Sequence, residues 1–257
     1  MAAFPENPLF YLVGLGATFL VAFGKGAFGG GLAILGIPLL ALVVDPLDAA
    51  IMVAVLVAAM DMFALKAFGR ANMSWPDLRI LMPGLVFGVG LGWVVFTKVD
   101  PRVVTLGIGL ITLAFTAQWF VKGRNEAAGS MPPNGPLGLL AGTVSGFTTF
   151  VAHAGGPPVA MYLLRRGVPK SVFAGTTVAF FTLGNVLKLP PYLWLGLKEP
   201  HTLWAALALL PAVPLGVWFG KAMHDRVDQK TLFLGCYLLL AVAALKLTVD
   251  ALRALLL

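Results

Sequence analysis

The sequence predicts an all-α integral membrane protein with about ten hydrophobic segments in two inverted repeats of five. Three observations predict this fold: an apolar composition, a series of segments close to membrane-spanning length, and an internal repeat at one constant offset. Of the 257 residues, 59% are hydrophobic and 11% are charged, whereas about 25% of the residues of a soluble protein are charged. The chain is therefore expected to lie in a lipid bilayer.

Ten apolar segments follow one another along the chain. A spanning helix needs about 20 apolar residues, and four of the segments fall short of that length. The short segments pair around two Gly-rich stretches, the first with the second and the sixth with the seventh. Each pair is expected to form short broken helices, either as a re-entrant hairpin or as two tilted, kinked spans. The segments are residues 8–23, 31–44, 48–67, 78–97, 102–121, 136–152, 157–165, 170–188, 202–222 and 230–252.

An internal repeat divides the chain into two halves. An offset of 128 residues aligns residues 81–107 with 209–235. Matches in Pro, Gly and Asp are harder to obtain by chance than matches in Leu or Val, so we interpret them as a duplication. The first repeat is assigned to residues 1–122, a polar linker to 123–135 and the second repeat to 136–257. The informative matches are Pro83/Pro211, Gly88/Gly216, Gly92/Gly220, Asp100/Asp228 and Gly107/Gly235.

Each half holds five segments, or three if the short pair is re-entrant. Both counts are odd, so the second half should lie upside down relative to the first. Many secondary transporters follow this plan and bind their solute between the repeats, near the membrane midplane.

The distribution of cations indicates the orientation of the protein. The net charge of +7 is not a nucleic-acid signal here, because Lys and Arg of membrane proteins collect in cytoplasmic loops. Eleven cations fall on one side and six on the other, so both termini are expected outside the inner (cytoplasmic) membrane. The eleven are Lys66, Arg70, Arg79, Lys122, Arg124, Arg165, Arg166, Lys170, Lys221, Arg226 and Lys230, and the six are Lys98, Arg102, Lys188, Lys198, Lys246 and Arg253.

The two Gly-rich stretches, Gly24–Pro38 and Ser145–Pro169, are expected to carry the site. Glycine frees the backbone, and Pro157-Pro158 cannot continue a helix. In lipid every freed backbone group must find a partner, so both breaks should be buried in protein or line a cavity. Free N–H groups at glycine-rich turns and helix N-termini bind anions.

These stretches supply most of the predicted substrate-binding residues. Lys25 adds a full positive charge, with the alternative that it extends to a membrane interface. The repeat offset places Lys25 on His153, which could bind the solute, change its protonation or simply satisfy a backbone carbonyl. The predicted set is Lys25, Gly26, Gly29, Gly30, His153, Gly155, Gly156 and Pro157.

Further polar residues interrupt apolar segments. Asp61 could carry a coupling proton or pair with Lys25, or it could make an ordinary interfacial ion pair near Lys66 and Arg70. Thr176, Thr177, Asn185 and Lys188 follow one another along the eighth segment, and the last three share roughly one helical face. They complete the predicted substrate-binding set, with interhelical hydrogen bonding as the alternative. Arg165 and Arg166 are expected only to mark the cytoplasmic edge.

Several other chemistries are not indicated. Gly24–Gly29 matches the dinucleotide pattern G-x-G-x-x-G, but no strand precedes it. No P-loop is present, so no ATPase is expected. The single Cys236 and three scattered histidines do not suggest a disulfide, a metal site or an enzyme. No cofactor is predicted.

The two breaks also resemble a known family. The first reads G-x-x-G-G-G-x-x-x-x-x-x-P from Gly26 to Pro38, and the second reads G-G-P-P-V-A-M-Y-L-L over residues 155–164, followed by A-G-T-T over 174–177. Together they resemble the sulfite exporter TauE/SafE family of membrane transporters, across essentially the whole chain. The resemblance implies transport of sulfur oxyanions, small organosulfur compounds or carboxylates, without selecting the solute or the direction.

The sequence thus predicts a secondary transporter or exporter of a small anion, most simply a sulfur oxyanion or an organosulfonate such as sulfite or a sulfoacetate-like compound. A passive anion channel or facilitator is the alternative. The expected partners are the anionic solute and the lipid bilayer, with no nucleic acid. A coupling ion, H⁺ or Na⁺, and a homodimer are compatible with the sequence but not selected by it.

Overall fold

The computed structural model describes residues 8–30, 35–95, 101–122, 131–152, 155–198 and 200–256. Within these ranges the regular structure is entirely helical. The elements are α1 (Pro8–Phe28), α2 (Gly36–Leu40), α3 (Pro46–Phe68), the 3-10 helix η2 (Arg70–Asn72), α4 (Trp75–Val95), α5 (Pro101–Lys122), α6 (Gly135–Ala152), α7 (Gly156–Arg166), α8 (Lys170–Lys198), α9 (Pro200–Leu209), α10 (Ala212–Arg226) and α11 (Gln229–Leu256).

Several of these helices can cross a membrane. Five described helices are long and apolar enough to span by themselves, and the bent pair α9–α10 would make a sixth. The five spans are Pro8–Phe28, Asp48–Phe68, Trp75–Val94, Lys170–Pro190 and Gln229–Leu255. The protein is therefore a multi-pass membrane protein, while the count of ten segments stays a prediction.

The ninth segment differs from its prediction. It was expected as one helix over residues 202–222, but α9 and α10 meet at a bend of 40°. Pro211 and Pro214 each lack an N–H donor, and Leu210 and Val213 instead make bonds three residues back, to Leu207 and Leu210. The matching helix α4 has Pro83 as its one interior proline and runs on without a break.

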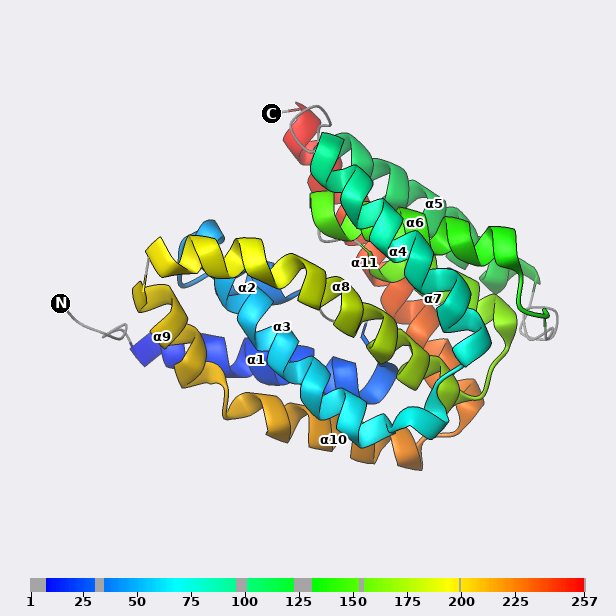
Figure 1. Cartoon of the computed structure of the whole chain (residues 1–257), viewed down its shortest axis with the longest axis horizontal. Coiled ribbons are helices and arrows are strands. Elements are labelled where there is room, and N and C mark those ends of the chain that lie inside the picture. The colour runs from blue at the N-terminus through cyan, green and yellow to red at the C-terminus, as the bar shows by residue number, and fades with distance from the viewer. Residues whose placement is uncertain are drawn as a thin grey trace.

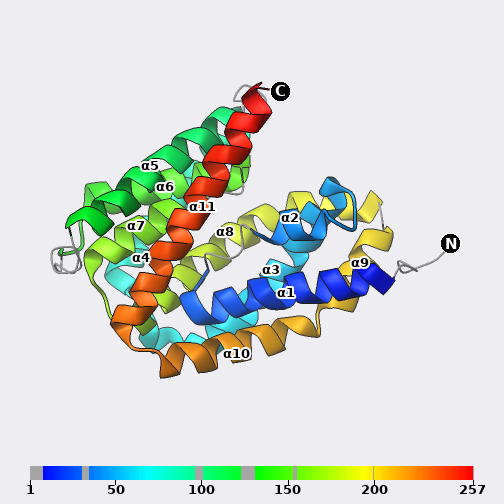
Figure 2. The same ribbon diagram turned by 180° about the vertical axis from the view of Figure 1, so that it is seen from behind.

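The helices form two lobes with separate apolar cores (Figures 1 and 2). The first lobe holds α1, α2, α3, α9 and α10, and the second holds α4, α5, α6, α7 and α11. Helix α8 lies between them and contributes to both cores, with Ala174 and Val178 in the first and Phe173 and Phe180 in the second. The lobes diverge from the end of the molecule where α3 meets η2 and α10 meets α11.

That shared end gathers helix ends that carry the predicted cytoplasmic cations. Lys170, at the start of α8, donates to the carbonyl oxygens of His224 and Val227 at the end of α10. At the opposite end of the second lobe, Arg102 of α5 donates to the carbonyl oxygen of Ala254, near the end of α11, at 2.6 Å. The structure therefore separates most of the two cation sets, but it does not show which end faces the cytoplasm.

Two helix pairs, one in each lobe, pack backbone to backbone: α1 with α10, and α6 with α4. A Cβ atom on Gly216 of α10 would lie 2.6 Å from the Phe19 carbonyl oxygen of α1, and one on Gly88 of α4 would overlap the Thr143 carbonyl oxygen of α6. Gly88 and Gly216 are related by the 128-residue offset of the repeat. Each half of the chain thus contributes one helix of each pair, so the two halves are interleaved.

Candidate functional site

Lys25 lies on a helix and not in an unwound stretch. The sequence indicated a break from Gly24 onward, but α1 continues through Lys25 and ends at Phe28. Gly26 explains the difference, because a Cβ atom there would overlap the Val217 carbonyl oxygen of α10. Gly26 therefore serves close helix packing, and the first break begins only at Gly29.

Lys25 forms a buried ion pair with Asp61 of α3. Lys25 is 4% exposed and Asp61 is 1% exposed. The second carboxylate oxygen of Asp61, Oδ2, accepts a hydrogen bond of 2.7 Å from Nδ2 of Asn185 on α8. Asp61 thus joins three helices, and its ionic partner is Lys25 and not Lys66 or Arg70.

Lys188 extends this polar chain into the second lobe. It follows Asn185 by about one turn of α8, and its ammonium group donates a 3.0 Å hydrogen bond to Oγ1 of Thr149 on α6. Asn185, the preceding polar residue of α8, contacts Asp61, so Lys188 lies next in the polar chain that begins at Lys25. Among the described residues no carboxylate pairs with Lys188 directly. The sequence placed Lys188 both at the outer edge and in the predicted site, and the structure joins it by a hydrogen bond to Thr149 of α6.

The first break rests against α8. Gly29 has a φ of 77°, a conformation that glycine adopts readily. A Cβ atom there would also lie 2.6 Å from the Ala174 carbonyl oxygen, and Gly30 faces the methyl group of Thr177. The Thr177 hydroxyl donates to the Phe173 carbonyl oxygen at 2.8 Å, so this side chain presents its apolar side to the break.

Thr176, unlike Thr177, binds the backbone between η2 and α4. Its hydroxyl oxygen accepts a 2.8 Å hydrogen bond from the backbone N–H of Ser74, between η2 and α4. Of the four polar residues predicted along α8, Asn185 contacts Asp61 and Lys188 contacts Thr149, while the two threonines fix helix packing.

The second break offers fewer donors than the sequence suggested. Gly155 has an ordinary backbone conformation, with a φ of −74°. It has no room for a side chain, because a Cβ atom would lie 2.6 Å from Cβ of Thr149. Its carbonyl oxygen accepts a 2.5 Å hydrogen bond from the Ser145 hydroxyl. Helix α7 then begins with Gly156, and Pro157 and Pro158 remove two of its first four N–H groups. His153 lies outside the described residues.

Gly156 differs from its neighbour, since a Cβ atom there would meet nothing within 4 Å. The N-terminus of α2 adds little, because that helix has only 5 residues. The positive character of the site therefore comes mainly from the two lysines and not from helix ends.

The resulting cluster carries an excess of positive charge. Lys25, Asp61 and Lys188 together sum to one net positive charge when all three are ionised. Asn185 and Thr149 complete it with neutral hydrogen-bonding groups. A buried unbalanced charge is unfavourable in a low-dielectric interior, so this cluster is suited to receive an anion.

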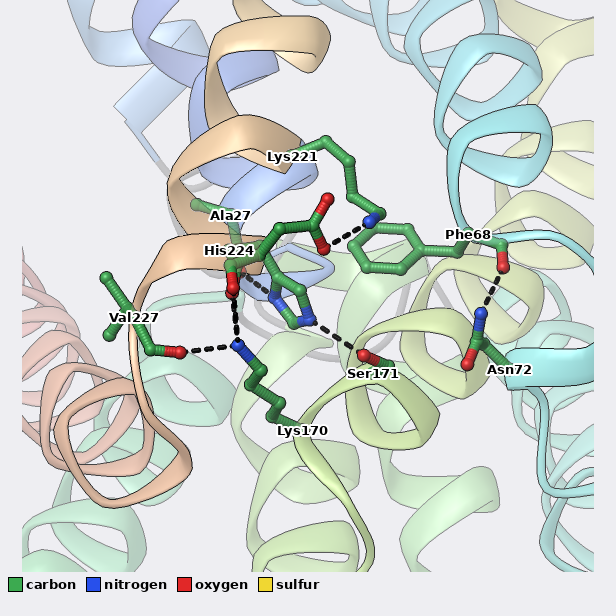
Figure 3. Close-up of polar contacts among 9 residues, drawn as sticks. Ala27, Phe68, Asn72, Lys170, Ser171, Lys221, His224 and Val227 are labelled. Carbon is green, nitrogen blue, oxygen red and sulfur yellow. Dashed lines mark hydrogen bonds and ion pairs between the residues drawn. The ribbon is translucent and has the colours of Figure 1, made fainter.

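A second polar cluster, at the shared end of the lobes, was not predicted from the sequence. Figure 3 shows His224 of α10 between Ala27 and Ser171. Its Nδ1 lies 2.8 Å from the Ala27 carbonyl oxygen and its Nε2 lies 3.2 Å from the Ser171 hydroxyl. A carbonyl oxygen can only accept, so Nδ1 carries the proton.

His224 therefore ties the last turn of α1, just before the first break, to the first turn of α8. Phe68, from the end of α3, stacks edge-on against the imidazole with ring centroids 5.1 Å apart. Lys221 lies 5.4 Å from the centroid of the Phe68 ring and pairs with Asp225 at 2.5 Å (Figure 3). The position of His224 beside Asp225 and Arg226 gave the sequence analysis no sign of burial.

A third cluster centres on Asp77, in the first turn of α4. Its Oδ1 accepts hydrogen bonds from the Tyr162 hydroxyl at 2.7 Å and from Nε of Arg166 at 2.9 Å. Its Oδ2 accepts from the Ser74 hydroxyl at 2.6 Å. Asp77 is fully buried, so Arg166 does more than mark an edge: it neutralises a buried carboxylate and joins α7 to α4. Arg165 instead lies over the Phe115 ring, 5.1 Å from its centroid.

No group of three or more His, Cys, Asp or Glu side chains suited to a metal ion occurs within the ranges that the structure describes. The cluster around Asp61 consists of the ammonium groups of Lys25 and Lys188 and the neutral side chains of Asn185 and Thr149.

The fold and the cluster together indicate the class of protein. It is a multi-pass helical membrane protein with a cationic cluster where the two lobes meet α8. The chain belongs to the Sulfite exporter TauE/SafE family, whose family model matches residues 14–247. The resemblance seen in the two Gly-rich stretches is thereby confirmed. Members of this family are membrane transporters and not enzymes. No curated protein and no solved structure matches the chain.

Proposed function

We propose that this protein is a secondary transporter that exports a small anion, most simply a sulfur oxyanion or an organosulfonate. The observation that carries the proposal is the cluster of buried Lys25 and Asp61 with partly buried Lys188, in which two cations accompany one carboxylate. An anion is the solute that brings such a cluster closer to neutrality.

The depth of the cluster supports a solute site inside the membrane. Asp61 lies seven residues before the end of α3, about 10 Å along the helix axis. The hydrocarbon core is about 30 Å thick. Lys25, which pairs with Asp61, is therefore well removed from the membrane surface.

The arrangement of helices supports alternating access between two inverted repeats. The α1–α10 and α6–α4 pairs, related by the 128-residue offset, place one helix of each repeat in each lobe. Helix α8 carries Asn185 and Lys188 and contacts both lobes. A rocking of one lobe against the other around α8 would expose the cluster first to one side of the membrane and then to the other.

The proposed orientation has the shared end of the lobes in the cytoplasm and both termini outside. Single cysteines at Arg70 and Asn134, in a Cys236→Ala background, would test it in intact cells. Protection of both positions from an impermeant thiol reagent is expected, and labelling of either in intact cells would reverse the orientation.

Transport itself is tested with the purified protein in liposomes. Uptake of ³⁵S-labelled sulfite and of two-carbon sulfonates should saturate with concentration and be accelerated by the same anion inside. Lys188→Met should reduce uptake at least tenfold, because the cluster then sums to zero charge. Lys246→Met removes a lysine that pairs with Asp250 on the outer part of α11, and should leave uptake unchanged.

The two candidate functions give different outcomes in the same vesicles. A passive channel would show conductance that does not saturate and no acceleration by internal anion. The absence of any protein-dependent flux of these anions would refute the proposed function.

A further inference from the structure

The charges of the cluster limit what the site can carry. Lys25 and Lys188 contribute two positive charges and Asp61 one negative charge. Asp61 contacts Lys25 and Asn185, and Lys188 follows Asn185 by about one turn of α8. A bound monoanion brings the sum to zero. A bound dianion leaves one excess negative charge in a low-dielectric site, which is unfavourable.

Asp61 can remove that excess by taking up one proton. Its Oδ1 contacts only the Lys25 ammonium group, while its Oδ2 is held by Asn185. A proton on Oδ1 would end the ion pair but keep the hydrogen bond from Asn185. The freed ammonium group of Lys25 could then turn to the dianion, so protonation and dianion binding would favour each other.

Other charged groups packed against α3 lie at its two ends. Asp48, in the first turn, accepts from Thr202 at 2.7 Å and lies near His201. Lys221 and His224 contact Phe68, seven residues or about 10 Å beyond Asp61. Arg70 follows in η2 and lies over Trp75. Lys25 and Lys188 are thus the charges that face Asp61 in the described part of the chain.

We propose that the site moves one net negative charge in each cycle: a monoanion alone, or a dianion together with one proton on Asp61. This rests on the proposed function, because it names the charge state of the solute and the coupling ion for the same site. The proton binds to Oδ1 of Asp61 on the side where the dianion enters and leaves to water on the side where the dianion is released.

One consequence concerns direction. Because one negative charge crosses in either mode, an inside-negative membrane potential favours export without a further coupling ion. Each ~59 mV shifts the distribution of the solute about tenfold toward the outside.

The test uses two probes of equal carbon number that differ in charge: isethionate, a monoanion, and sulfoacetate, a dianion at neutral pH. Binding of each to the purified full-length protein is measured by calorimetry in buffers with different heats of ionisation, which reports the protons taken up. Close to one proton per sulfoacetate and none per isethionate is expected. Binding of sulfoacetate without proton uptake would overturn the inference while leaving anion binding intact.

Asp61→Asn shifts the expected preference toward the dianion. The cluster then has two positive charges and no titratable carboxylate, so sulfoacetate should bind without proton uptake. The affinity for sulfoacetate relative to that for isethionate should rise by roughly 5–150-fold, the usual range for coupled sites. Asp250→Asn, which removes a carboxylate from the exposed pair with Lys246, should leave both probes as in the wild type.

The wild-type measurement needs no variant, so misfolding of Asp61→Asn would not remove the test. If neither probe binds to a folded wild-type protein, the assignment to organosulfonates fails and the inference fails with it. Proton uptake that is equal for both probes would contradict the charge rule alone.

Discussion

Each half of the chain contributes one lysine to the cluster beside α8, but the two lysines have different partners. In the first half Lys25 pairs with the carboxylate of Asp61, whereas Lys188 of the second half is held by the hydroxyl of Thr149. The main helix pairs of the two lobes correspond, with Gly216 of α10 against α1 in one lobe and Gly88 of α4 against α6 in the other. The excess positive charge therefore arises from side chains that differ between the halves and not from the shared framework.

The largest effect on stability is expected when the compensated lysine is removed. Lys25→Met leaves Asp61 buried with only the amide of Asn185 as a partner, and breaking a buried pair in this way costs about 3–5 kcal/mol. Thermal unfolding in detergent should show a large loss. The double variant Lys25→Met/Asp61→Asn should recover most of it, and a double variant as unstable as Lys25→Met would mean that the ion pair is not the cause.

The shared framework can be tested at matching positions. Gly88→Ala would bring a methyl group into the Thr143 carbonyl oxygen of α6, and Gly216→Ala would place one 2.6 Å from the Phe19 carbonyl oxygen of α1. Overpacking of this kind costs about 1–3 kcal/mol, and both variants should lose stability by similar amounts.

Gly90→Ala is the matched control, since a Cβ atom there meets nothing within 4 Å. Its melting temperature should stay at or slightly above that of the wild type, because alanine favours a helix more than glycine does. A loss at only one of Gly88 and Gly216 would show that the two helix pairs are not equivalent.

The uncompensated lysine should matter less for stability than for binding. Lys188→Met removes one hydrogen bond from a charged group to Thr149, a loss of about 1.5–3 kcal/mol, but it also removes the cost of holding an ammonium group without an ionic partner. The melting temperature should therefore change little, while the affinity for an anion falls clearly in calorimetry. A Lys188→Met protein that is as destabilised as Lys25→Met would erase the distinction between the two lysines.

Four residues of the cluster were predictable because each is ionisable or amide-bearing within an apolar segment, whereas Thr149 was missed because threonines are common in membrane helices. Lys25, Asp61, Asn185 and Lys188 all stood out for that reason, and the structure joins them. The length of α1 was not predictable, since glycines such as Gly26 can either unwind a helix or let two helices approach closely. Only the position of α10 decides between the two.

The clusters at the shared end were missed for another reason. His224 and Asp77 lie beside several charged residues at helix ends, where the sequence pattern is that of an exposed loop. Their burial depends on contacts with partners far along the chain, such as Ala27 with His224 and Tyr162 with Asp77. Such contacts leave no periodic signal in the sequence.

The smallest expected effect concerns the two matching aspartates, Asp100 and Asp228. Asp228 directly precedes α11, and its Oδ2 accepts a 3.1 Å hydrogen bond from the backbone N–H of Thr231. Hydrogen bonds from Thr231 hold the pKa of this exposed carboxyl below its ordinary value. Asp100 would occupy the same place before α5, but it lies outside the described residues.

A lowered pKa in the folded protein means that the ionised form stabilises the fold. This contribution is fully present above the ordinary Asp pKa of about 3.9 and is lost as the pH falls through the lower folded value. Asp228→Asn can still cap the helix but cannot ionise. The wild type should therefore melt at a slightly higher temperature than the variant at pH 6.5, and the gap should close as the pH is lowered below 4. The same experiment with Asp100→Asn tests whether the duplicated turn is capped alike in both halves, and a gap that is constant with pH in either variant would show that the aspartate charge does not stabilise that helix.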